Sequence, residues 1–170
     1  FGISLIRSRE ELSKIEAVFA YESPILIERF IRGEFYTIGI LECGGKVHTL
    51  PCVKGVELQD GRENKDPESL KVFTGDYAVR SADLPEETIL LMEQMAKRVF
   101  AVTGAEDIAR IDFMVSQEDG APYVLEINAV PGLKPRSLLP GEAKMAGMTY
   151  QELIEGILLS AWEKGRAEDK

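Results

Sequence analysis

Two short runs of alternating polar and apolar residues, joined by a single turn, constrain this chain more than any other feature. The runs span residues 109–115 and 123–128, and the segment 116–120 between them has the composition of a hairpin turn. Successive side chains of a strand point to opposite faces, so Arg110 and Asp112 are expected on the same face of this hairpin.

The same alternation places Val124, Glu126 and Asn128 together on one face of the second run. With the turn centred on the intervening segment, Asp112 lies opposite Glu126, and Arg110 is then opposite Asn128. Carboxylates that face each other repel, and a divalent cation between them would remove this penalty. Oxygen ligands from Asp, Glu and Asn suit Mg²⁺.

A solvated face of a two-stranded ribbon carries the same pattern, so the hairpin alone leaves a metal site and a wet surface as alternatives. Arg110, beside the acidic pair, suits a phosphate or a developing negative charge. The second run ends sharply at Pro131 and Gly132, which favours the functional alternative, because such breaks often present groups on a rigid scaffold.

Composition narrows the class of protein. The chain has 170 residues, of which 45% are hydrophobic, enough for one folded domain, and its formal net charge of −9 argues against a broad nucleic-acid surface. No apolar run has the length of a membrane span. A single histidine, His48, argues against a zinc site and a histidine-based triad. The start at Phe1 suggests a fragment or a processed product.

Three segments are expected to form helices. Capping boxes at residues 8–11 and 149–152 begin the first and the third, and Pro85 begins the second, which ends at Gly104. Apolar residues at helical spacing give the inward faces of the second and third helices: Ile89, Met92, Ala96, Val99 and Phe100, then Leu153, Ile157, Leu158 and Ala161.

Strands are expected at residues 24–27, 35–41 and 46–53, the last two joined by a tight hairpin at Gly44 and Gly45. With the polar hairpin they give an antiparallel sheet of at least four or five strands. Helices would cover one face of this sheet, which is an α+β fold without a division into two domains.

Three other segments are candidates for binding. Residues 54–82 are a long, irregular stretch, either a lid or a flexible insertion, in which Lys71 can reach a phosphate. Glu28 and Glu34 flank a turn that suits recognition of adenine and ribose, although such glutamates are more often solvated surface. Ser137 suits an anion or, equally, the cap of a turn.

The chain resembles the ATP-grasp superfamily, and it is especially similar to D-alanine–D-alanine ligases. The resemblance rests on ARIDF (residues 109–113), EINAVPG (126–132) and SLLP (137–140). The segment 25–35 resembles the hinge and ribose segment of these ligases, and 146–154 their last helix. The similarity spans nearly the whole chain and implies an ATP-grasp-type antiparallel sheet.

The resemblance implies roles for individual residues in binding Mg²⁺ (or Mn²⁺) and the reacting groups. The metal ions would be held by Asp112, Glu126 and Asn128. Arg110 would steady the transferred phosphoryl group or the tetrahedral state, and Ser137 would bind the carboxylate of the acceptor.

It also implies a nucleotide site. Adenine would meet Glu28, Arg29 and Ile31, and Leu125 is assigned to the same nucleotide site. Glu34 would bind the ribose, and Lys71 would contact phosphate from the lid.

The implied function is that of a cytoplasmic, ATP-dependent carboxylate–amine ligase that joins two D-alanines through an acyl phosphate for peptidoglycan precursor synthesis. Residues 1–170 would be its C-terminal domain, inactive without an N-terminal part of the same chain. A homodimer is one assembly this allows; nucleic acid and membrane are not expected partners. Ala129, Val72 and residues 133–136 depart from the family pattern, so another ATP-grasp amino-acid ligase and a non-catalytic nucleotide-binding module stay open as alternatives.

Overall fold

The computed structural model describes residues 3–20, 24–59, 62–63 and 76–168, which form two compact units with a boundary between Ile31 and Arg32. The first unit carries a 3-10 helix, η1 (Arg9–Ser13), and α1 (Lys14–Phe19). The helix expected from the first capping box therefore begins as a 3-10 turn. Residues 24–27, expected as a strand, form none, because no neighbouring strand pairs with their backbone.

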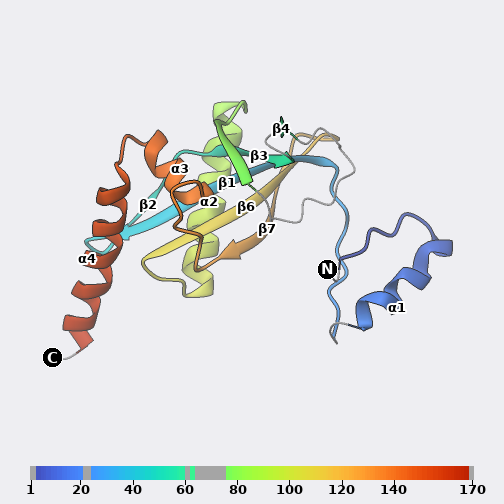
Figure 1. The fold of residues 1–170 in the computed structure, drawn as a ribbon, viewed down its shortest axis with the longest axis horizontal. Coiled ribbons are helices and arrows are strands. Elements are labelled where there is room, and N and C mark those ends of the chain that lie inside the picture. Colours follow the sequence, from blue (N-terminus) through green and yellow to red (C-terminus); the bar gives the residue numbers. More distant parts are fainter. Residues whose placement is uncertain (1–2, 21–23, 60–61, 64–75, 169–170) are drawn as a thin grey trace. The chain divides into compact units, whose positions relative to one another are not determined.

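The second unit is built on an antiparallel sheet in which β4, β3, β1, β6 and β7 follow one another (Figure 1). The strands are β1 (Gly33–Cys43), β2 (Lys46–Thr49), β3 (Val53–Gln59), β4 (Arg62–Glu63), β5 (Asp76–Ser81), β6 (Ile108–Ser116) and β7 (Pro122–Asn128). β2 pairs with β1 and β5 with β3. Gly44 and Gly45 have φ of 57° and 71°, as a two-residue hairpin requires, which confirms the predicted β1–β2 turn.

One face of the sheet packs against α2 (Glu86–Thr103). Ile38 and Ile40 of β1 and Ile111 of β6 meet the buried side of this helix there. The helix begins after Pro85 and ends at Gly104, whose φ of 67° stops it, and its predicted inward residues all lie in this core.

The other face of the sheet carries α3 (Leu138–Met145) and α4 (Tyr150–Glu168). Gly39, which alternates with Ile38 and Ile40, faces Leu139 of α3. The predicted antiparallel sheet with packed helices is thus confirmed, but the prediction that the helices cover one face is wrong, because they lie on both faces. Both faces are needed because β1 and β6 are buried along almost their whole length.

The stretch expected to be a long irregular loop contains sheet strands. Residues 53–58 of β3 pair with residues 76–81 of β5 in an unbroken antiparallel register. Alternation in this stretch is hidden by Gly55, which lies against the ring of Phe35, and by charged residues such as Lys54. Lys71 lies outside the described residues.

The capping box of α4 is confirmed. The Glu152 carboxylate accepts hydrogen bonds from the Thr149 amide (2.7 Å) and hydroxyl (2.8 Å), and the Thr149 hydroxyl oxygen accepts one from the Glu152 amide (3.2 Å). The helix packs on the sheet through Leu153 and Ile157. Leu158 and Ala161, predicted to point inward, are exposed, because the contact stripe runs on through Ser160 and Lys164.

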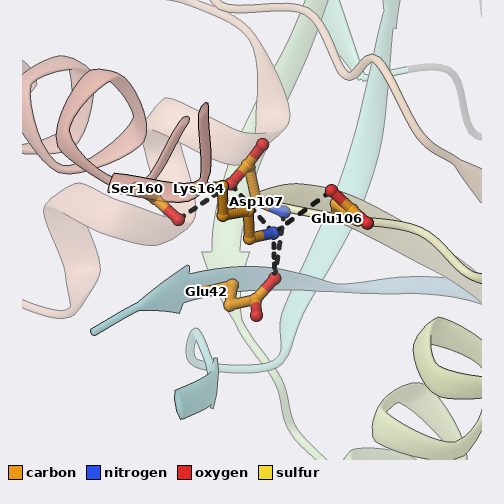
Figure 2. A network of polar contacts seen from close by, with 5 residues as sticks. All are labelled: Glu42, Glu106, Asp107, Ser160 and Lys164. Carbon is orange, nitrogen blue, oxygen red and sulfur yellow. Dashed lines mark hydrogen bonds and ion pairs between the residues drawn. The ribbon is translucent and has the colours of Figure 1, made fainter. Parts of the chain in front are cut away.

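Figure 2 shows how α4 is fixed to the start of β6. The Lys164 ammonium lies 2.7 Å from Glu42 Oε2, 3.1 Å from Asp107 Oδ1 and 3.5 Å from Glu106 Oε2. The Ser160 hydroxyl donates a hydrogen bond to Asp107 Oδ1 (2.8 Å). Asp107 has a φ of 60°, an uncommon conformation for a residue with a side chain, and these contacts hold it there.

Among the described residues, no helix has both the length and the apolar character needed to cross a bilayer.

Candidate functional site

The site is built on the β6–β7 hairpin. Asp112 pairs with Glu126, and Arg110 pairs with Asn128, as the sequence predicted. The turn, in which the Ser116 hydroxyl oxygen accepts a hydrogen bond from the Glu118 amide at 3.1 Å, sets the register nearest to it, Val115 with Pro122. The polar residues of the two strands are therefore cross-strand neighbours.

A β-bulge in β7 aligns the two polar faces. The register shifts between Asp112 and Phe113, so that Phe113 pairs with Val124 and Leu125 is the extra residue. Val124 packs in the core under α2, together with Ile127. The prediction that Val124 shares a face with Glu126 is therefore wrong: the bulge lets apolar residues three apart both face the core.

The buried centre of the site is a hydrogen-bonded Arg110–Asp112 pair. Arg110 Nε donates to Asp112 Oδ1 (2.8 Å) and Nη2 donates to Oδ2 (2.7 Å). The Thr37 hydroxyl also donates to Oδ1 at 2.8 Å. Asp112 is fully buried, and Arg110 is 8% exposed. Such bidentate, charge-assisted pairs are strong and fix the orientation of both groups.

A third carboxyl group, that of Glu142 in α3, lies on the same face. It is fully buried, and neither oxygen has a hydrogen-bond partner among the described residues. Burial raises its pKa to about 8, an effect that Asp112 reinforces and that the Gly39 amide and Arg110 oppose. Sequence reasoning missed this residue, because a buried glutamate in a short helix has the same local pattern as an exposed one.

The donor set on this face fits a hard cation with phosphate ligands. It offers two opposed carboxylates, those of Asp112 and Glu126, and the side-chain amide of Asn128, which lies beside Glu126 on the same face. Asn128 Oδ1 accepts a hydrogen bond from the Val130 amide at 3.2 Å. Within the described ranges, no three His, Cys, Asp or Glu side chains form a complete metal cage. Mg²⁺ needs no such cage, because it usually takes one or two carboxylates and completes its shell with phosphates and water.

Glu34 is the predicted site residue that the structure directs elsewhere. It pairs with Val115 and lies on the α2 face of β1, because it is out of phase with Thr37. There its carboxylate binds Lys54 (2.6 Å) and accepts a hydrogen bond from the Tyr36 hydroxyl (3.1 Å). The structure therefore does not bring Glu34 together with the acidic pair.

Other predicted residues lie at the edge of the site or in the first unit. Ser137 immediately precedes α3, and its hydroxyl makes no capping hydrogen bond. Leu125 is 39% exposed at the bulge, next to Glu126. Glu28, Arg29 and Ile31, assigned to adenine, belong to the first compact unit.

Comparisons with known proteins agree on one group of relatives. A family model described as "D-ala D-ala ligase C-terminus" matches residues 1–159. A D-alanine–D-alanine ligase of Laribacter hongkongensis is 36% identical over 162 residues, covering 94% of this chain and 50% of the relative. One from Halalkalibacterium halodurans is 33% identical over 155 residues, covering 91% and 50%.

Solved structures give the same result. A D-alanine–D-alanine ligase from Bacillus anthracis, complexed with ATP, is 29% identical with a TM-score of 0.75, covering 96% of this chain and 50% of that one. The enzyme from Coxiella burnetii has a TM-score of 0.78 at 21% identity, a likeness of fold alone. The chain thus spans about half the length of the relatives it matches.

Proposed function

This chain belongs to the D-ala D-ala ligase C-terminus family, and we propose that residues 1–170 form the C-terminal, nucleotide- and Mg²⁺-binding part of an ATP-dependent carboxylate–amine ligase. Its substrates are ATP and two D-alanines, and its product serves peptidoglycan precursor synthesis in the cytoplasm. The single observation that carries this proposal is the pairing of Asp112 with Glu126, with Asn128 next to them on the same face.

In the proposed reaction, a carboxylate oxygen of the first D-alanine attacks the γ-phosphorus of ATP, and ADP leaves with the electron pair of the broken P–O bond. The neutral amine of the second D-alanine then attacks the acyl carbon, phosphate leaves with the electron pair of the C–O bond, and the nitrogen releases one proton to solvent as the amide forms. Negative charge gathers on the transferred group in the first step, so the catalytic problem is positioning and charge neutralisation.

Different residues of the site are proposed to bind Mg²⁺ and to neutralise the charge of the transferred group. Asp112, Glu126 and Asn128 are the oxygen ligands for Mg²⁺. When bound, Mg²⁺ supplies positive charge at the phosphates and orients them. Arg110, which lies 2.7 Å from Asp112, places a positive charge near the transferred group.

Substrate contacts are proposed at the edge of this face. Ser137, with its hydroxyl unused by the helix that follows, donates to the carboxylate of the acceptor amino acid. Leu125 offers an exposed apolar side chain to the adenine. Glu28, Arg29 and Ile31 are proposed to contact adenine, Glu34 to bind the ribose and Lys71 to contact phosphate.

Mn²⁺ binding in the presence of ADP tests the proposal. In the full protein, Asp112→Asn and Glu126→Gln should each weaken Mn²⁺ binding, as measured by the EPR signal of free Mn²⁺. Glu155→Gln, which removes one exposed carboxylate from α4, is the matched control and should bind as the unsubstituted protein does. Unchanged binding in the Asp112→Asn, Glu126→Gln double variant would remove the proposal.

Two alternatives make other predictions. A related ligase would bind Mn²⁺ and ADP in the same way, but would release phosphate with amino acids other than D-alanine when a panel of them is assayed. A non-catalytic module would bind nucleotide and release no phosphate with any of them. The homodimer remains a prediction that sedimentation of the full protein tests.

A further inference from the structure

Glu142 occupies a position that the proposed reaction leaves unused. A Cβ on Gly39 would overlap Glu142 Oε2, so the carboxylate fills the space that the glycine leaves open. Gly39 pairs with Arg110 in the β1–β6 ladder. Paired residues share a face of the sheet, so the Glu142 carboxylate lies over the strand position next to Arg110.

The Arg110 guanidinium is committed to Asp112. It donates two hydrogen bonds to that carboxylate, and the Thr37 hydroxyl donates a third. These bonds occupy three of the roughly four lone-pair sites of the carboxylate. A divalent cation at Asp112 would share the carboxylate with the positively charged guanidinium, and the repulsion between the two positive charges favours release of the guanidinium.

A guanidinium displaced into a buried space needs another anion, because an unpaired buried charge is costly. Glu142 is fully buried and its two oxygens are unpartnered among the described residues. Of the charged groups that act on it, Arg110 favours its charged form and Asp112 opposes it. Once a cation occupies Asp112, the Arg110 guanidinium needs an anion and the Glu142 carboxyl group needs a hydrogen-bond donor, and each can supply what the other lacks.

We propose that Glu142 is the second acceptor of the Arg110 guanidinium, to which Arg110 turns when a divalent cation binds Asp112. Glu142 is then a positioning residue: it touches neither metal nor substrate, and it frees a metal ligand by holding the arginine in a defined place. This inference rests on the proposed function, which supplies the cation at Asp112.

A double-mutant cycle on Mn²⁺ affinity tests the proposal in the full protein with ADP present. Glu142→Gln keeps the shape of the side chain but cannot ionise, so it offers no carboxylate to Arg110; Arg110 then stays on Asp112, and Mn²⁺ should bind about tenfold more weakly. In an Arg110→Met background, Asp112 has no competitor, and the same Glu142→Gln change should alter Mn²⁺ affinity less than about twofold.

The cycle separates the proposal from simple electrostatic attraction. A through-space effect of the Glu142 charge would weaken Mn²⁺ binding by the same factor in both backgrounds, and that result would overturn the proposal. Unchanged affinity in Glu142→Gln with Arg110 present would overturn it as well. Glu155→Gln controls for the loss of one carboxylate.

A direct readout covers the case in which Arg110→Met does not fold. A crystal structure of the full protein with Mg²⁺ and ADP should place an Arg110 Nη within hydrogen-bond distance of Glu142, and Arg110 remaining bidentate on Asp112 would contradict the proposal. Loss of Mn²⁺ binding in Asp112→Asn, with no effect of Glu142→Gln, would reject this inference while leaving the proposed function intact.

Discussion

The Glu142 carboxylate lies over Gly39, where any other residue would carry its Cβ. This contact joins α3 to the middle of β1, at the position that pairs with Arg110. The glycine is therefore required by close packing and not by an unusual backbone conformation.

Gly39→Ala should destabilise the protein by about 1–3 kcal/mol, because the added methyl group also meets Leu139 and Leu50 in a packed layer. Urea unfolding followed by circular dichroism measures the change. Gly156→Ala is the matched control: its Cβ would meet nothing within 4 Å, and it should be neutral or stabilising. Equal stability of Gly39→Ala and the unsubstituted protein would show that the layer is not packed as described.

Glu142 should make stability fall as the pH rises. Burial raises its pKa from 4.5 to about 8, so the folded state holds a proton that the unfolded state loses. The contribution is fully present below pH 4.5 and is lost as the pH approaches 8. Relative to Glu142→Gln, the unfolding free energy should decline by at most about 1.4 kcal/mol per pH unit in this window. The unfolding free energies of the two proteins are measured against pH with EDTA present. If both change with pH in the same way, Glu142 does not contribute the expected pH dependence.

Leu125→Ala should separate binding from stability. The side chain is 39% exposed, so only part of it packs on folding, and the unfolding free energy should fall by about 1 kcal/mol. If it covers adenine, ADP should bind roughly tenfold more weakly, since each buried methylene contributes about 0.8 kcal/mol. Calorimetric titration of ADP measures the affinity, with the 87% exposed Val130→Ala as control. ADP affinity equal to that of the control would remove Leu125 from the site.

Lys164→Met should loosen the C-terminal helix at neutral pH. Lys164 hydrogen-bonds Glu42 and thereby holds the pKa of that carboxyl below its ordinary value of 4.5. This stabilisation is present above pH 4.5 and is lost as the pH falls through the lowered pKa of Glu42. The variant should lose about 1 kcal/mol at pH 7 and less at pH 3. Urea unfolding at both pH values tests this, with the exposed Lys97→Met as control; an equal loss at both pH values would point to lost packing instead.

The features that could be predicted from the sequence are those that depend on residues close together in the chain. The shared face of Arg110 and Asp112 followed from alternation along β6, which acts locally, whereas the pairing of Asp112 with Glu126 also depends on the bulge at Leu125. The limits of α2 followed from Pro85 and Gly104, whose backbone preferences act locally. These features needed no knowledge of distant contacts.

Features that depend on distant partners were predicted less well. Val124 faces the core because a bulge at Leu125 changes the alternation, and bulges leave little trace in a sequence. The face of the sheet on which Glu34 lies could not be predicted from its neighbours in the chain, because it is set by pairing with β6. The burial of Glu142 depends on the space above Gly39, which is 103 positions earlier in the chain by their numbering.

The left-handed turn at Asp107 has a consequence for β6, the strand that follows it. Its carbonyl accepts a hydrogen bond from the Glu42 amide at 2.7 Å, and its carboxylate is clasped by Ser160 and Lys164. A shift of β6 by one residue would turn Arg110 and Asp112 toward the apolar core beneath α2, because successive side chains of a strand point to opposite faces. A truncation of α4 ahead of Ser160 would remove both of these contacts to Asp107 without touching any proposed ligand.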